Sequence, residues 1–482
     1  MTVYYLQSSK GPTDFMRFMI ARLVLIFMLL GYGFAAFGQS STVGTEFWVG
    51  FMDNNRVPGS GNNPGAPDFA VIVITANENT TGALEYRGQT APFSLNAGQQ
   101  FTLRVPSEDL DLLHRNSGVI ENKGIHITSS GKIAVHAFNE RYRSADGTVV
   151  LPVGALGRDY YITSHYEILT ANVNFNGNID DESTLLVVAT EDNTEIEITT
   201  TADSQSGNQA GTPRNVILNR GQSYQIKAKG DLTGSRVRVI GDDGDDCKKI
   251  AVFGGNKWTS VGNCGEANDH LFQQAYPVTT WGTSFAHVAL SGRTSGELVK
   301  VLASEDNTEV LVNGTSRGVI NRGEFLPLEF GINESGKIDT SKPASVTVFS
   351  KSMACNQPTA PGAFTGDPFM ITYSPSEQFL TSLTFNALNL PSITNHYVNV
   401  VVKTGTELFT ILDGQNIGSR FFPLPGDPEF QYARINISQG VHQMRNAEGF
   451  AAYVYGFGEL ESYGYAAGAA LDNMNLTWME KK

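Results

Sequence analysis

Short apolar runs separated by polar turns extend along most of the chain. Residues 185–189 (LLVVA) form an uninterrupted apolar run, and residues 196–198 (IEI) alternate apolar with polar side chains. A run of the first kind indicates a buried strand, and alternation with a period of two indicates a strand with one buried face. The 50 glycines, with many Asn, Asp, Ser and Thr residues, suit tight turns between such strands. The pattern predicts an all-β protein.

One arrangement of strands and turns recurs four times. Its first motif is a polar tetrad, which is found at residues 77–80, 191–194, 305–308 and, more loosely, 404–407. The three clear copies are spaced 114 residues apart. A second motif, LNAGQ in its first copy, is found at residues 95–99, 218–222, 320–324 and, more loosely, 437–441. An apolar run closes each copy, at residues 133–138, 250–253, 346–349 and 451–455. Asn and Asp tolerate left-handed backbone angles, so each tetrad is predicted to be a hairpin turn.

The repeat predicts four tandem antiparallel β units. A unit of roughly 100 residues with several short strands is typical of a β-sandwich of immunoglobulin size. We therefore predict sandwich-like modules at residues 39–150, 151–265, 266–374 and 375–482, the last with a C-terminal tail. A propeller-like ring of four large blades is the alternative, because sequence patterns predict strands but not their pairing.

Residues 1–38 are predicted to be a signal peptide. Arg17 and Arg22 precede an apolar run at residues 23–30, and small residues follow at 36–38, where a signal peptidase would cleave. The apolar run is short for a membrane-spanning helix of about 20 residues, which leaves a retained anchor as the alternative. We expect a secreted or cell-surface protein with no membrane span after signal removal.

The net charge restricts the possible partners, and the number of cysteines restricts the possible disulfides. The formal net charge of −14 argues against nucleic acid, because binding to phosphates needs clustered Lys and Arg. Three cysteines in an exported chain allow one disulfide. Cys247 and Cys264 flank the apolar run at residues 250–253 and are the predicted pair. Three buried free thiols are the alternative.

No residue is assigned to catalysis or to a metal. Cys264, Asp269 and His270 are close in sequence, but their spacing fits no closed zinc motif. Carboxylates at residues 180–182 and 242–246 could hold calcium, although neither group has the ordered spacing of a known calcium loop. The chain also lacks the His-Glu-x-x-His motif of zinc hydrolases. We expect no cofactor, with calcium as the alternative.

An aromatic cluster near the C-terminus is the candidate binding site. Tyrosine combines an apolar face with a polar tip, which suits contact with a carbohydrate or a protein. The same rings could instead fill a sandwich core, with their hydroxyls bonded at its corners. The cluster comprises Tyr453, Tyr455, Phe457, Tyr463 and Tyr465.

Several separated blocks of the sequence resemble the N-terminal domain of IgG-Fc-binding proteins, a family with many bacterial members. The blocks include GTEFWVGF at residues 44–51, ATEDNT at 189–194, FGGNK at 253–257 and YVYGFG at 453–458. The resemblance spans residues 44–470. Two positions depart from the family pattern: Trp258 stands where relatives often carry a cysteine, and Ala466 stands where a proline is usual.

The resemblance implies an extracellular interaction domain whose partner is a protein or glycoprotein, such as immunoglobulin Fc or a mucin-type glycoprotein. Bacterial relatives commonly continue into further β modules and a sorting domain, so a chain ending at Lys482 is expected to be a short or truncated member. We predict a secreted or cell-surface adhesion protein that recognises a protein or glycan and is not an enzyme. The alternatives are a structural spacer of a surface assembly and a polysaccharide-acting enzyme.

Overall fold

The computed structural model describes residues 41–55, 67–141, 143–167, 182–241, 248–264, 268–357, 365–390 and 392–471. These residues form 31 strands and five 3-10 turns and contain no α-helix, which confirms the all-β prediction. Residues Ser40–Lys482 make one compact unit of the chain. The predicted signal peptide lies outside the described residues.

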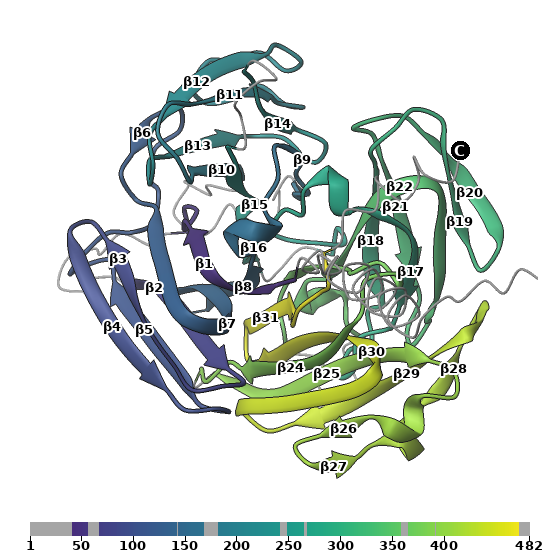
Figure 1. Cartoon of the computed structure of the whole chain (residues 1–482). Coiled ribbons are helices and arrows are strands. Elements are labelled where there is room, and N and C mark those ends of the chain that lie inside the picture. The colour runs from purple at the N-terminus through teal and green to yellow at the C-terminus, as the bar shows by residue number, and fades with distance from the viewer. Residues whose placement is uncertain are drawn as a thin grey trace, which may run out of the picture. The chain divides into compact units, whose positions relative to one another are not determined.

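The strands fall into four groups that follow one another along the chain (Figure 1). The first group contains β1 (Val43–Val49), β2 (Asp68–Ala76), β3 (Thr80–Tyr86), β4 (Gln89–Leu95), β5 (Gln100–Pro106), β7 (Ile125–Arg141) and β8 (Ser144–Val150), followed by η1 (Val153–Ala155). The second contains β9 (Asp159–Tyr161), β10 (Ser183–Ala189), β11 (Thr194–Thr199), β12 (Arg214–Leu218), β13 (Ser223–Ala228), β14 (Arg236–Val239), β15 (Ile250–Thr259) and β16 (Asp269–Gln274), joined by β6 (Ile120–Glu121) and followed by η2 (Val278–Thr280).

The third and fourth groups repeat this order. The third contains β17 (Gly282–His287), β18 (Glu297–Ala303), β19 (Thr308–Val312), β20 (Thr315–Ile320), β21 (Phe325–Phe330), β22 (Gly336–Ser350), η3 (Met353–Cys355) and β23 (Met370–Thr372). The fourth contains β24 (Leu380–Ala387), β25 (Ile393–Lys403), η4 (Glu407–Phe409), β26 (Ile411–Leu412), β27 (Gln415–Asn416), η5 (Gly418–Arg420), β28 (Phe422–Leu424), β29 (Asp427–Ile437), β30 (Gly440–Gly458) and β31 (Glu461–Ala466). Strand β16 pairs with β15 and so belongs to the second group, although the predicted division assigned residue 266 onward to the third unit.

Each group is a sandwich of two layers, and in three of the groups the layers share a long strand. In the first group, the N-terminal half of β7 pairs with β1 and β3, and its C-terminal half pairs with β2 and β8. Strands β22 and β30 are shared in the same way. In the second group, two strands replace the shared one: β14 pairs with β9 and β11, and β15 pairs with β10 and β16. The prediction of four sandwich-like antiparallel units is confirmed.

The tetrads lie at corners between layers and do not form hairpins, so the hairpin prediction is wrong. Strands β10 and β11 flank the second tetrad but belong to different sheets. Asn193 in this corner has φ 53°, and its backbone N–H donates to Asn219 Oδ1 at 3.0 Å, in the second motif. Asn307 repeats the geometry with φ 55° and a bond to Asn321. The two motifs recur together because the corners that they form are hydrogen-bonded to each other.

One strand from each group meets at the centre of the protein. Strand β8 contacts β16 and β31, which lie near it in Figure 1, and β23 contacts the same two strands, so the four form a closed cycle. The predicted alternative of a ring therefore describes how the sandwiches are arranged. The first and last described segments close this arrangement: Thr42 N–H donates to the Ala469 carbonyl at 3.0 Å, and Ala469 N–H donates to Thr42 Oγ1 at 3.1 Å.

A single carboxylate joins the four central strands. Asp146 on β8 is fully buried, and its Oδ1 accepts N–H groups of Gly147 at 2.8 Å and Gly464 at 3.2 Å. Its Oδ2 accepts those of Phe272 at 3.0 Å and Met370 at 3.3 Å. Burial raises the pKa of Asp146, and the four N–H donors oppose that shift. Each donor comes from a different group, so this side chain is bonded to all four.

Hydrophobic cores continue across the boundaries between groups. One cluster combines Ile72 of the first group with Leu186 and Phe253 of the second. Another places Val71 and Phe138 of the first group among residues of the fourth, and a third joins the third group to the fourth. The four sandwiches therefore share hydrophobic cores and are packed as one body, not as independent domains.

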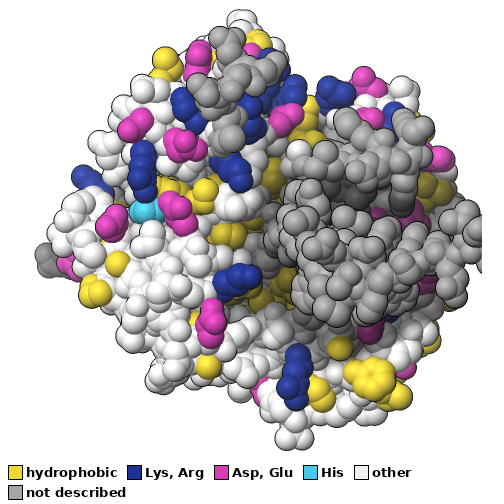
Figure 2. Space-filling view, viewed as in Figure 1, with side chains coloured by type: hydrophobic (Ala, Val, Ile, Leu, Met, Phe, Trp, Pro, Cys, Tyr) yellow, Lys and Arg dark blue, Asp and Glu magenta, His cyan; other side chains and the backbone are white. Residues whose placement is uncertain are grey.

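The face visible in Figure 2 carries Lys and Arg side chains interspersed with Asp and Glu. Among the described residues of this face, positive charge does not gather in the continuous strip that a phosphate backbone requires. In the described part of the chain, no helix has the length and apolar character needed to cross a membrane.

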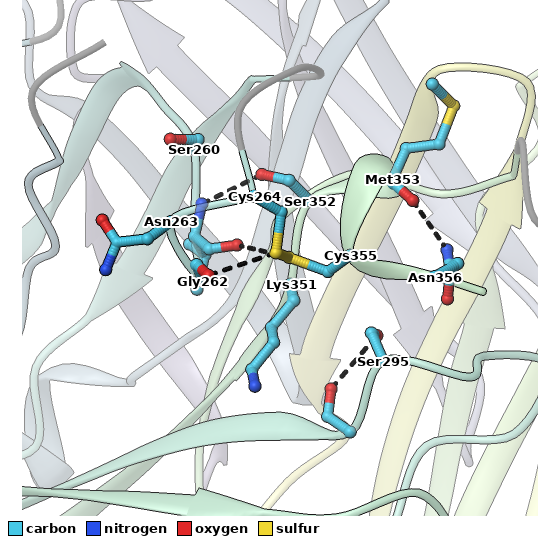
Figure 3. The surroundings of a disulfide bond; sticks show 12 residues. Ser260, Gly262, Asn263, Cys264, Ser295, Lys351, Ser352, Met353, Cys355 and Asn356 are labelled. Carbon is cyan, nitrogen blue, oxygen red and sulfur yellow. Dashed lines mark hydrogen bonds between the residues drawn. A yellow bond between two sulfur atoms is a disulfide. The ribbon is translucent and has the colours of Figure 1, made fainter. Parts of the chain in front are cut away.

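The disulfide joins Cys264 to Cys355, so the predicted pairing of Cys247 with Cys264 is wrong (Figure 3). The two Cα atoms lie 5.2 Å apart although 91 residues separate them in sequence. Two bonds hold these segments together: Val261 N–H donates to Ser352 Oγ at 3.0 Å, and Ser352 N–H donates to the Val261 carbonyl at 2.9 Å. Packing between the second and third groups therefore decides the pairing. Cys247 lies outside the described residues.

We predict that Asp146→Asn lowers the free energy of unfolding by about 2–6 kcal/mol. An amide oxygen replaces only one of the two acceptors, and its NH₂ group faces two N–H donors, each of which loses about 1–3 kcal/mol when left unsatisfied. Denaturant unfolding measures the change. Asp109→Asn, at an exposed carboxylate, is the matched control. An equal and small effect of both variants would contradict the role assigned to Asp146.

We predict that peptide mapping without reductant recovers Cys264 linked to Cys355. Cys355→Ser should lower the free energy of unfolding by about 4 kcal/mol, because the bond closes a 91-residue loop in the unfolded chain. Cys247→Ser should leave both the link and the stability unchanged. Recovery of a Cys247–Cys264 peptide from the native protein would overturn the assignment.

Candidate functional site

The fourth group exposes three large apolar side chains in or shortly after its turns η4 and η5. They are Leu408 and Phe409 on η4 and Phe422 on β28, with exposed fractions of 61%, 65% and 61%. Turn η5 packs against the backbone of Leu408, and Phe422 follows η5 by two residues. Figure 2 shows hydrophobic side chains gathered over this region, near β26 and β28 of Figure 1. We call these three residues the apolar edge.

The apolar edge arises where the fourth copy departs from the repeat. The corner after the second strand spans four residues in the second and third groups, 190–193 and 304–307, and seven in the fourth, 404–410. The longer corner contains η4, and two of its residues are Leu408 and Phe409. Sequence reasoning missed this site, although the loose match of the fourth tetrad was a signal for it.

Side chains fix the backbone beneath the apolar edge. Asn446 Nδ2 donates to the Thr406 carbonyl at 3.0 Å and to Thr410 Oγ1 at 2.9 Å. Asn416 Nδ2 donates to the Leu408 carbonyl at 2.6 Å. These bonds hold η4 in one conformation while its apolar side chains stay outside. Each exposed Leu or Phe forgoes about 1.5–3 kcal/mol of burial, so covering the edge with a partner would be favourable.

The adjacent Val119 and Ile120 are less exposed, at 45% each, and two more strongly exposed apolar residues lie singly. Ile217 on β12 and Val319 on β20 are 58% and 60% exposed, and each lies singly on an outer strand. Single exposed apolar residues are ordinary on soluble proteins, whereas a group of them marks a contact surface. The apolar edge therefore differs from these positions in grouping and not in degree of exposure.

The five aromatic residues predicted to form a binding surface are buried, so that prediction is wrong. Tyr453, Tyr455, Phe457, Tyr463 and Tyr465 are at most 2% exposed. Their hydroxyls bond inside the protein: the Tyr455 hydroxyl accepts an N–H at 2.8 Å and donates to a side-chain oxygen at 2.8 Å, and the Tyr463 hydroxyl accepts an N–H at 3.1 Å. Burial raises the pKa of both phenols above the ordinary value. The cluster is sandwich core, which was the alternative interpretation.

The candidate metal ligands that the structure describes are not brought together. Cys264 is oxidised, so it supplies no thiolate. His270 is buried with Nδ1 directed at the Lys257 carbonyl, and burial lowers its pKa to about 3. Among the described residues, no three His, Cys, Asp or Glu side chains are placed to hold an ion. The calcium candidates at residues 180–181 and 242–246 lie outside the described part, and Glu182 is buried beside Lys227 at 3.4 Å.

Comparison with known proteins agrees with the resemblance of the sequence blocks. The family described as IgGFc binding protein matches residues 146–456. The human protein named IgGFc-binding protein is 22% identical over 391 residues, which cover 77% of this chain and 7% of that protein. The chain thus spans less than a tenth of the length of this curated relative.

Two solved structures give weak matches. One, from work on a Ca²⁺-stabilized adhesin with which an Antarctic bacterium binds ice, is 10% identical, covers 89% of this chain and 99% of its own, and has a TM-score of 0.10. The other, from work on host cell surface retention of a bacterial ice-binding adhesin, is 9% identical, covers 64% and 90%, and has the same TM-score. Such scores carry no argument about fold or function. The family match extends over more than half of the sequence, and the chain belongs to the IgGFc-binding protein family.

Proposed function

We propose that this chain is an extracellular adhesion module that binds a protein or glycoprotein through the apolar edge. The observation that carries the proposal is the grouping of Leu408, Phe409 and Phe422 on a backbone fixed by hydrogen bonds. Membership of a binding-protein family supports it. Secretion by removal of residues 1–38 and the absence of enzymatic activity are parts of the same proposal.

The energetics suit a small contact surface. Interfaces obtain most of their binding energy from a few apolar or aromatic side chains that enter pockets of the partner. Burial of three such residues contributes about 4–9 kcal/mol before the loss of translational freedom and of side-chain entropy. A rigid loop loses little further entropy on binding. By the family name, immunoglobulin Fc is the first partner to test, with mucin-type glycoproteins next.

A structural spacer is the second candidate function. The cores that continue from one group to the next favour it, because a body without internal hinges keeps other components of an assembly that contact it at fixed positions. The two candidates differ at the apolar edge, which an adhesion module uses and a spacer does not.

We predict that the double variant Leu408→Ser, Phe409→Ser weakens binding to the partner at least tenfold. Loss of each buried side chain removes about 1.5–3 kcal/mol, and 1.4 kcal/mol corresponds to a factor of ten in Kd. The exported chain is first tested on an array of glycans and glycoproteins that includes immunoglobulin Fc and mucin. Surface plasmon resonance on the strongest ligand then compares the variants.

The matched control is Ile217→Ser, Val319→Ser, which removes two apolar residues of similar exposure from the outer strands. It should bind as the wild type does. Both double variants should keep the wild-type unfolding midpoint, since all four positions are exposed. Undiminished binding by the Leu408/Phe409 variant would exclude the apolar edge, and failure of the wild-type chain to bind any arrayed ligand would favour the spacer.

A further inference from the structure

Lys300 is an ammonium-bearing side chain enclosed at the boundary of two groups. It lies in the middle of β18, between Thr347 on β22 and Pro327 on β21, and its side chain is 3% exposed. Its Nζ lies 4.5 Å from the centroid of the Phe325 ring and 5.5 Å from that of Phe349. A cation in such surroundings loses hydration that only specific partners replace.

Its carboxylate partner comes from the second group. Asp231 lies in the turn between β13 and β14, and its Oδ2 is 2.5 Å from Lys300 Nζ. Asp231 Oδ1 points the other way and faces two donors on Thr233, the backbone N–H at 2.9 Å and the hydroxyl at 2.6 Å. Nζ also donates to the Ser164 carbonyl at 2.7 Å. The amine and the carboxyl group are thus held in one mutual orientation.

Lys227, another buried and paired lysine, has a different environment. Lys227 Nζ lies 3.1 Å from Asp53 and 3.4 Å from Glu182, so two carboxylates stabilise its positive charge. Asp53 is also paired with Arg115 at 3.1 Å and with Lys257 at 3.3 Å, so three cations share it. Lys300 contacts one carboxylate and two aromatic rings, and its Nζ also donates to Thr233 Oγ1 at 3.1 Å. At Lys300 one amine therefore faces one carboxyl group, whereas Lys227 lies in a network of several charges.

We propose that Lys300 and Asp231 condense to an amide bond that links the second and third groups covalently. One proton passes from Nζ to Oδ2 and leaves a neutral amine beside a neutral acid. Nζ attacks Cγ of Asp231, and a tetrahedral centre forms. The bond from Cγ to Oδ2 then breaks, and Oδ2 leaves as water with a second proton from Nζ. The step converts an ammonium and a carboxylate into an amide and one water, without oxidant or reductant.

The surrounding groups favour each part of this step. Burial lowers the pKa of Lys300, and the attraction of Asp231 and Glu167 only partly offsets it. Burial acts to raise the pKa of Asp231, but Lys300 and the Thr233 donors outweigh it and lower that pKa, so the pair rests as ammonium and carboxylate and the reaction begins with the proton transfer. The Thr233 N–H is placed to stabilise negative charge that develops on Oδ1 in the tetrahedral centre, and the Thr233 hydroxyl, which also lies 2.7 Å from the Ser164 carbonyl, can turn its proton to Oδ1 as that charge develops. Because the fold already holds the two reacting groups in contact, the reaction avoids the entropy loss of a bimolecular step. Enclosure by Phe325 and Phe349 keeps bulk water from the amine.

The amide bond would be a second covalent link between the groups that Cys264 and Cys355 already join. Unlike the disulfide, it would persist under reducing conditions. This inference is independent of the proposed adhesion function, because it concerns a boundary between groups and not the apolar edge.

We predict that intact-mass spectrometry of the exported, denatured and reduced chain gives a mass lower than that of the linear sequence by one water. The reference is Lys300→Arg, which keeps the positive charge beside Asp231 but cannot condense, so the comparison does not depend on where the leader is cleaved. Lys351→Arg is the matched control. Lys351 lies 2.5 Å from Glu329, as Lys300 does from Asp231, but Glu329 is 63% exposed. The Lys351→Arg variant should still have a mass one water below that of its linear sequence.

Tryptic mapping of the wild-type chain decides the question even if Lys300→Arg fails to fold. A branched peptide that joins the segments of Lys300 and Asp231, with no cleavage after Lys300, is the expected result. Cleavage after Lys300 together with a full-length mass would overturn the proposal. A cross-link between any other two residues that accounts for the loss of one water would also overturn the proposal.

Discussion

The architecture depends on how four sandwiches satisfy the backbone where their inner strands meet. Strands β8, β16, β23 and β31 come from different groups, and an unsatisfied N–H at their meeting point would be costly because water does not reach it. Asp146 supplies both carboxylate oxygens to that point and accepts one N–H from each group. A carboxylate is suited to this position since it is an acceptor on both sides and donates nothing. The three other groups are thus held by one side chain of the first.

The sequence predicts what is local and misses what depends on pairing. Strands, the four-fold repeat and the left-handed Asn193 and Asn307 follow from alternation and turn chemistry, which are read within a few residues. The mistaken hairpins, the mistaken disulfide and the buried tyrosines share one cause. Each depends on which strands lie side by side, and strands that flank one turn here belong to different layers. Nothing near Asp146 in sequence marks it as the acceptor for three distant strands.

The candidate functional site could not be predicted from the sequence repeat either. A repeat predicts what its copies have in common, whereas the apolar edge lies in a corner that only the fourth copy lengthens. Exposure of Leu408 and Phe409 cannot be derived from their apolar character, which by itself favours burial. The surrounding amide side chains of Asn416 and Asn446 decide it, because they fix the backbone of η4. A loose match in an otherwise regular repeat is thus worth inspection as a site of function.

The hydrogen bonds between Thr42 and Ala469 have a consequence for how such a module is carried. Polypeptide attached before the first residue of the fold and polypeptide attached after its last would emerge from one spot. Tension applied through both attachments would pull on these two bonds first and would hardly load the sandwiches. A module attached in this way would project sideways from the polypeptide that carries it and would add little to the total length. That geometry suits a domain that displays a surface better than one that sets a distance.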